Sequence, residues 1–179
     1  MACVLDVFEK RRSVRRYSSR PLPKDALERC LEAARLAPSA CNSQPWRFVV
    51  TDKSPLKERL ALAAFGGVYS LNSFAKDAPV LITVISERPV ALVRLGGFLK
   101  RVDYSLIDVG IACEHLVLQA AAEGIGTCWL GWFNERAVKQ VLKIAGGIRV
   151  EAMVAMGYSA DTAEPKRRKS LDEIRSYAG

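Results

Sequence analysis

SLIDVGIACEHLVLQAAAE, residues 105–123, is the stretch that decides the fold. It is long enough for about five helical turns, and apolar residues fall on nearly every side. A helix that is apolar all round must be buried all round. We expect its own sheet to cover one side and a second subunit the other, since Leu106, Val109, Leu116 or Val117 would otherwise face water. The alternative is a central helix in the core of a monomer.

Four other stretches predict strands. VLITVI, residues 80–85, is continuously apolar and rich in β-branched residues, which is typical of a strand buried on both faces. TCWL, at 127–130, predicts a second buried strand, and VEAMVAMGY, at 150–158, alternates like a third. A short strand is predicted at Arg47–Thr51. Together these strands predict a central sheet.

Helices are predicted before and between the strands. Helical spacing and capping residues place them at Val4–Arg12, Lys24–Ala37, Pro55–Ala64 and Asn134–Ile144. Because helices and strands are intermixed without regular βαβ units, we predict an α+β fold with a mixed or antiparallel sheet flanked by helices. We expect residues 1–179 to form one domain, with a polar C-terminal arm from about residue 159.

The composition favours a cytoplasmic protein. Uncharged apolar stretches fall well short of the roughly 18–20 residues of a membrane span, and the charges between Asp6 and Arg12 exclude a signal peptide. Five cysteines without a CxxC pair, and one histidine, argue against a disulfide framework or a zinc site. We therefore expect reduced thiols, a structural role for His115 and no bound metal.

The net charge of +8 is concentrated near the two ends of the chain. One cluster comprises Arg11, Arg12, Arg15, Arg16 and Arg20, and the other Lys166, Arg167, Arg168 and Lys169. No basic run lies between them, which suggests that the two ends meet at one anionic group. From charge alone, a phosphate-bearing ligand and a solvated surface explain the clusters equally well, with nucleic acid third.

The chain lacks the side-chain patterns of hydrolysis and phosphoryl transfer, but it carries two groups of hydrogen-bond donors. RRSVRR, residues 11–16, offers guanidinium and hydroxyl donors suited to phosphate. PSACNSQPW, residues 38–46, clusters hydroxyls and amides between stiffening prolines. Such donors suit a cofactor that brings its own reactivity, so no catalytic side chain is predicted.

These segments carry a resemblance to a known family. RRSVRRYSSRPLP, APSACNSQPWRFVV, EGIGTCWLGWFNE and PKRRKSLDEI, taken in order, resemble the successive signatures of the FMN-dependent nitroreductases. The match runs across nearly the whole chain. It implies a nitroreductase-like fold, FMN as cofactor, NADH or NADPH as electron donor, and a homodimer with the long helix at its interface.

The resemblance also implies which residues hold FMN. The N-terminal motif would serve the phosphate and ribityl oxygens, with Arg15 near the N1/O2 edge of the ring, where a cation favours the anionic reduced flavin. The 38–44 loop would reach the cofactor, usually from the other subunit, and the backbone at 130–132 would pass flavin N5. The implied contacts are Arg11, Arg12, Ser13, Arg15, Pro38, Ser39, Asn42, Gln44, Leu130, Gly131, Trp132, Lys166 and Arg168.

The implied reaction passes hydride from NAD(P)H through flavin N5 to nitroaromatic, quinone or similar conjugated acceptors by a ping-pong mechanism. No nucleic-acid or membrane partner is expected. The alternatives are a relative with reductive dehalogenation, enoate reduction or flavin fragmentation, a non-catalytic FMN-binding protein, and a basic nucleic-acid-binding domain.

Three places depart from the family pattern. Larger members carry glutamate where Gly131 stands, so contacts with the ring edge must differ. The asparagine expected upstream of the buried strand corresponds best to Asn72, but its spacing is displaced by one and it is not assigned. Glu87–Arg101 matches no motif, and we expect this segment near the mouth of the site, where it would set specificity.

Overall fold

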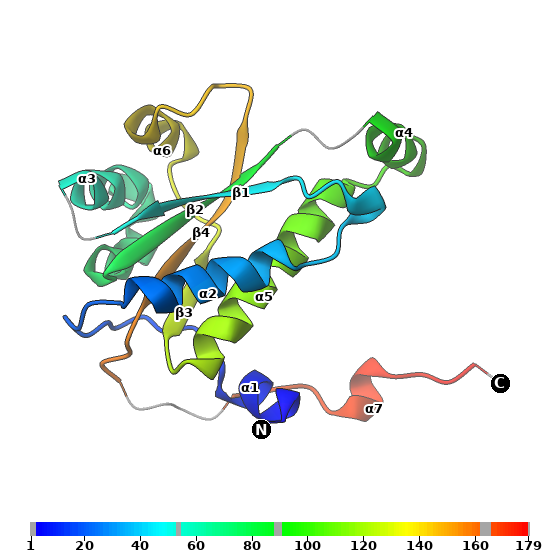
Figure 1. Cartoon of the computed structure of the whole chain (residues 1–179), viewed down its shortest axis with the longest axis horizontal. Helices are drawn as coiled ribbons and strands as arrows, with labels where there is room; N and C mark the ends of the chain where they lie inside the picture. The colour runs from blue at the N-terminus through cyan, green and yellow to red at the C-terminus, as the bar shows by residue number, and fades with distance from the viewer. Residues whose placement is uncertain (1–2, 53–54, 88–90, 162–165, 179) are drawn as a thin grey trace.

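The strand β2 (Val80–Ser86) lies at the centre of the fold. In the computed structural model, which describes residues 3–52, 55–87, 91–161 and 166–178, β2 pairs with β1 (Trp46–Thr51) and with β4 (Arg149–Gly157). β4 pairs in turn with β3 (Gly126–Leu130), so the order is β1-β2-β4-β3 and each pairing is antiparallel (Figure 1). The predicted α+β fold with a central sheet is therefore confirmed.

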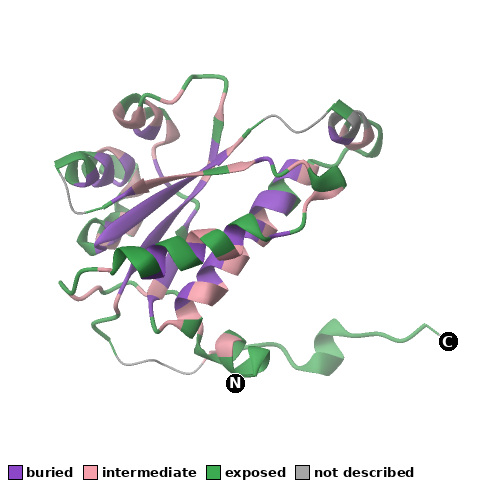
Figure 2. Ribbon diagram, in the orientation of Figure 1, coloured by how far each residue is buried: buried purple, intermediate pink, exposed green. Residues whose placement is uncertain are grey.

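Successive residues of β2 point into two separate core layers, because neighbouring strand residues face opposite sides of a sheet. Ile82 and Val84 pack against α2 (Lys24–Arg35) and α5 (Tyr104–Ala122). Leu81 and Ile85 pack on the opposite side, against α3 (Pro55–Ala64) and α6 (Glu135–Leu142). The sheet is thus buried between helices on both faces (Figure 2), as the apolar run at 80–85 predicted.

The long helix α5 forms as predicted, but its exposed side differs from the prediction. Val109, Leu116 and Val117 are buried within the chain, so the expectation that they face water in a single subunit was wrong. They belong to the core layer that α2 closes, and α2 supplies the cover that we had assigned to a second subunit. Leu106 and Ile107 do remain exposed, at 42% and 51% of their surface.

By length and composition alone, α5 is apolar enough to span a membrane. It packs against α2 and the sheet, and Asp103 caps its first turn by accepting a hydrogen bond from the backbone N of Ser105 at 3.1 Å. Burial in the core of this fold therefore accounts for its apolar character. His115 also has a structural contact there, with Nδ1 3.3 Å from the backbone O of Ala33.

The remaining elements can be compared with the helices that the sequence predicted. α1 (Val4–Lys10) packs on α5 and ends before Arg11, so the two arginines that we placed in its last turn lie outside the helix. α6 begins after Asn134, whose side chain accepts from the backbone N of Ala137 at 3.1 Å, the N-cap that the sequence predicted. Four elements were not predicted: η1 (Ala40–Asn42), η2 (Gly67–Asp77), α4 (Ala91–Lys100) and α7 (Leu171–Ile174).

Two leucines of α3 provide a test of the core. Leu60 is fully buried, whereas 72% of Leu62 is exposed. Leu60→Ala should lower the free energy of unfolding by about 2–5 kcal/mol, because it leaves a cavity in a packed layer. Leu62→Ala, the matched control, should change it by no more than about 0.5 kcal/mol. Chemical denaturation of both variants makes the comparison, and equal losses would contradict this assignment of the core.

Candidate functional site

The residues after α1 form an extended strap, residues 11–18, that runs along β3. The backbone N of Val14 donates to the O of Thr127 at 2.9 Å, and Ser13 pairs with Thr127 in a parallel bridge. Gly126 permits this close approach, since a Cβ there would lie 2.5 Å from Cγ2 of Val14. The basic side chains of the strap are therefore held directly beside the start of β3.

Tyr17 fastens the strap to the sheet. Its hydroxyl lies 2.8 Å from the backbone O of Val14 and 3.3 Å from that of Ala155 in β4, so its one proton is shared between carbonyls of both segments. Burial raises the pKa of Tyr17 well above its usual value, which keeps the hydroxyl protonated. The sequence prediction missed this residue, although an aromatic directly after RRSVRR was a visible signal.

The chain that leaves β4 pairs with the same strap. The backbone N of Ser18 donates to the O of Tyr158 at 2.9 Å, and that of Ala160 to the O of Arg16 at 3.0 Å. Further along, Lys166 Nζ donates to the backbone O of Phe8 at the end of α1. The two basic clusters therefore meet, as their positions in the sequence suggested.

Together these segments enclose a cavity of about 850 Å³. Its walls are the strap, the turn between α5 and β3, and the C-terminal segment. Six of the predicted site residues line it: Arg11, Arg12, Ser13, Arg15, Lys166 and Arg168. Lys10 and Arg16 add to the positive lining. Arg16 belongs to the predicted basic cluster, whereas Lys10 was in neither cluster.

The cavity concentrates positive charge. Desolvation, and then the charges of Arg11 and other neighbouring guanidinium groups, hold the pKa of Lys166 below its usual value. Arg16 is partly offset by Asp161, whose carboxylate lies 3.1 Å from it. A polyanionic group would relieve the mutual repulsion of the remaining cations and accept several charge-assisted hydrogen bonds. The arrangement therefore suits a phosphate.

Comparison with known proteins places this chain in a family. A model of the nitroreductase family matches residues 8–158, a span that includes the strap, the 38–44 loop and β3. The chain belongs to the nitroreductase family.

Relatives of this nitroreductase-family chain match over nearly its whole length. An NADH dehydrogenase of Thermus thermophilus is 29% identical over 92% of this chain and 91% of its own. An iodotyrosine deiodinase of Thermotoga neapolitana is 27% identical over 97% and 96%. The solved structure of an FMN-dependent nitroreductase of Clostridium difficile has a TM-score of 0.75 and 25% identity, and covers 97% of this chain and 98% of that one.

The second predicted group of site residues lies away from the cavity. It comprises Pro38, Ser39, Asn42 and Gln44, in and around η1. The backbone N of Ala40 donates to Oδ1 of Asp108 at 3.0 Å, near the start of α5. The residue of α5 that lines the basic cavity is Ala121, near the end of the same helix. The two positions are about 20 Å apart along α5, so one nitroreductase-family chain does not bring the two groups together.

The η1 loop is braced in a strained conformation. Ser39 Oγ accepts from the backbone N of Gln44 at 3.0 Å, and Gln44 Nε2 donates to the backbone O and Oδ1 of Asn42, both at 3.2 Å. Cys41, Asn42 and Gln44 have φ values of 50°, 52° and 44°, in the left-handed region. Such strain costs roughly 1 kcal/mol or more per residue and is concentrated at functional sites.

The third group, Leu130, Gly131 and Trp132, lies at the far end of β3 from the cavity, about 13 Å along the strand. Leu130 is buried, while Gly131 and Trp132 are exposed. Asn72 Nδ2 donates to the backbone O of Trp132 at 2.9 Å, so η2 holds this strand end. The structure thus places Asn72, which the sequence left unassigned, beside the third group.

Removal of the Tyr17 hydroxyl should loosen the strap. Tyr17→Phe should lower the free energy of unfolding at neutral pH by about 1 kcal/mol, since two carbonyls lose their donor. Because burial raises the pKa of Tyr17 in the folded state, its contribution is complete below about pH 10 and is lost as the pH rises further. The stability of the unmodified protein should therefore fall more steeply above pH 10 than that of Tyr17→Phe.

Tyr177→Phe is the control, because 84% of Tyr177 is exposed. Denaturation curves between pH 7 and 11 make the comparison. If Tyr17→Phe and Tyr177→Phe behave alike at both ends of this range, Tyr17 does not fasten the strap.

Proposed function

We propose that this chain is an FMN-dependent oxidoreductase that uses NADH or NADPH to reduce nitroaromatic, quinone or similar conjugated acceptors. The observation that carries the proposal is the convergence of the two basic clusters on one cavity beside β3. Membership of the nitroreductase family, and relatives described as an NADH dehydrogenase and an FMN-dependent nitroreductase, support it.

The residues around the cavity fit the phosphate end of FMN. Arg11, Lys166 and Arg168 would bind the phosphate, and the hydroxyl of Ser13 would bind it or the ribityl chain. Arg15 would lie toward the ring, and β3 would lead from the phosphate to Gly131 and Trp132. When bound, FMN carries reducing equivalents from NAD(P)H to the acceptor in two separate half-reactions. The protein's part is then to bind and orient.

Loss of one phosphate contact should weaken FMN binding. Arg11→Ala and Arg168→Ala should each raise the FMN dissociation constant roughly ten- to a hundred-fold, because each removes a charge-assisted hydrogen bond. Arg167→Ala is the matched control, since Arg167 is exposed and does not line the cavity. Fluorescence titration with FMN gives the constants. Equal constants for all three variants would exclude the phosphate from this cavity.

We also propose that the protein is a homodimer whose two sites each draw on both chains. The η1 loop and the cavity lie about 20 Å apart along α5, so a cofactor held by both must bridge two subunits. If two copies of α5 pack antiparallel about a two-fold axis, the start of one helix lies beside the end of the other. The η1 loop of one chain then approaches the strap of its partner.

The exposed side of α5 supports this arrangement. Its outward stripe comprises Ile107, Gly110, Ile111, Glu114, Leu118 and Ala121, each exposed or half-buried in the single chain. Cover by a second copy would remove apolar surface from water at roughly 25 cal/mol per Å². Leu171, Ile174 and Tyr177 in the C-terminal arm are likewise mostly exposed in this chain.

A charge in the stripe should disrupt the dimer. Ile107→Asp should give monomers or aggregates that have also lost FMN, because the carboxylate would be buried at the two-fold interface. Leu62→Asp is the control, since Leu62 is exposed on the opposite side of the sheet. Sedimentation measures the outcome. A flavin-loaded species at the monomer mass of 19.7 kDa, before any substitution, would contradict the dimer.

Reductive dehalogenation is the second candidate function, favoured by the similarity to an iodotyrosine deiodinase. A protein that binds FMN without turnover, and a nucleic-acid-binding domain, are the remaining rivals. Oxidation of NADH or NADPH by the purified protein, with nitroaromatic, quinone and haloaromatic acceptors in parallel, separates these functions. In this proposal the chain is one domain and works in the cytoplasm.

A further inference from the structure

A second cavity, of about 750 Å³, lies at the opposite end of α5 from the basic one. It is enclosed by α4, the end of β2, the start of α5 and the start of β4. Its volume falls in the range of small-molecule sites. Val93, Phe98, Val102 and Tyr104 give it apolar and aromatic walls.

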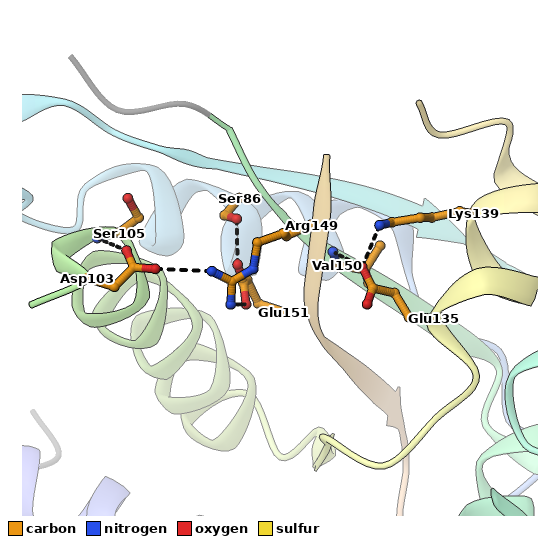
Figure 3. Close-up of polar contacts among 8 residues, drawn as sticks. All are labelled: Ser86, Asp103, Ser105, Glu135, Lys139, Arg149, Val150 and Glu151. Atoms are coloured by element: carbon orange, nitrogen blue, oxygen red, sulfur yellow. Dashed lines mark hydrogen bonds and ion pairs between the residues drawn. The ribbon is translucent and has the colours of Figure 1, made fainter. Parts of the chain in front are cut away.

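The polar floor of this cavity is engaged in contacts of its own. Figure 3 shows Arg149 between Asp103 and Glu151, with a nitrogen–oxygen distance of 3.1 Å to each carboxylate. Ser86 Oγ donates to Glu151 at 2.5 Å, and the backbone N of Ser105 donates to Asp103 at 3.1 Å. Asp103 and Glu151 therefore each have two kinds of donor, and the charge of Arg149 is already shared between them. Glu87, which also lines the cavity, is paired with Arg47 at 2.7 Å.

Arg101 differs from these floor residues. Within the part of the chain that the structure describes, its guanidinium has no hydrogen bond or ion pair, although it lines the cavity. Its φ of 54° lies in the left-handed region, where a residue with a side chain is strained. An arginine held there without a partner is a candidate for binding an anion.

The turn that carries Arg101 is built into the sequence. The backbone N of Val102 donates to the O of Gly97 at 3.0 Å, which closes the turn at the end of α4. A Cβ on Gly97 would lie 2.6 Å from the O of Val102, so only glycine fits. Beside the turn, Phe98 exposes 82% of its surface. An aromatic face and a cation thus stand together at the cavity mouth.

We infer that this cavity binds aromatic monocarboxylates, with Arg101 on the carboxylate and the Phe98 side chain against the ring. A planar carboxylate matches the paired donors of a guanidinium, and an exposed aromatic side chain offers a stacking surface. α4 contacts η1, the loop that would reach the cofactor of the partner subunit. This inference rests on the proposed function: the cavity selects anionic aromatic acceptors for that cofactor.

The probe is 4-nitrobenzoate, compared with its neutral methyl ester. Two electrons and two protons, supplied by NAD(P)H and one solvent proton, convert the nitro group to a nitroso group and release water. Arg101→Gln should lower kcat/KM for 4-nitrobenzoate roughly ten- to a hundred-fold through KM, because it removes a charge-assisted contact. The kcat/KM of this variant for the methyl ester should stay within about two-fold of the value for the unmodified holoenzyme. Lys100→Gln, at an exposed neighbour outside the cavity lining, should affect neither acceptor.

Binding of redox-inert benzoate, measured by calorimetry on the FMN-loaded protein, tests the cavity without turnover. Benzoate should bind the unmodified protein and the Lys100→Gln variant, and bind Arg101→Gln at least ten-fold more weakly. The inference would be overturned if Arg101→Gln lowered kcat/KM equally for 4-nitrobenzoate and its methyl ester, or if benzoate binding did not depend on Arg101. If no acceptor is reduced but benzoate binding still depends on Arg101, the proposed function is wrong and the cavity assignment stands.

Discussion

The backbone pairing of the strap with β3 is the constraint on which the basic site depends. The hydrogen bond between Val14 and Thr127 sets the position of each neighbouring arginine, and Gly126 leaves the space for it. Tyr17 then links the same segment to β4. Rigid backbone attachment matters here because ordering a segment costs both backbone and side-chain entropy. In a strap whose backbone is already fixed, only the side-chain part of that cost is left for a ligand to offset.

The same arrangement carries an electrostatic cost when no anion is bound. Several cations share one cavity, and desolvation, together with the charges of the neighbouring guanidinium groups, lowers the pKa of Lys166. Such a concentration of like charge destabilises the folded state unless an anion is bound. In the proposed function, ligand binding and folding stability are therefore linked, and the free energy of unfolding should depend on the concentration of phosphate-bearing ligands.

Local patterns predicted the elements well where the signal was strong, as in the continuous apolar run at 80–85 and the capped helix after Asn134. The meeting of the two basic clusters was also predictable, since charge without an intervening basic run has few explanations. Long-range cover was not predictable: Val109 and Leu116 are buried because α2 lies over them, a fact that no local pattern contains. Tyr17 was missed although it directly follows RRSVRR, because its link to Ala155 in a distant strand is not visible in a local pattern.

The contact between Lys166 and Phe8 joins residues 158 positions apart. During synthesis, the strap leaves the ribosome early, but β4, which anchors it, and the C-terminal cations emerge only after most of the chain has been made. The sheet cannot be completed earlier, because β3 joins it only through β4, the last strand in the sequence. A nascent chain therefore exposes its arginines before their cavity exists. In the proposed function, cofactor capture therefore belongs to the final stage of folding, when the last strand has been released.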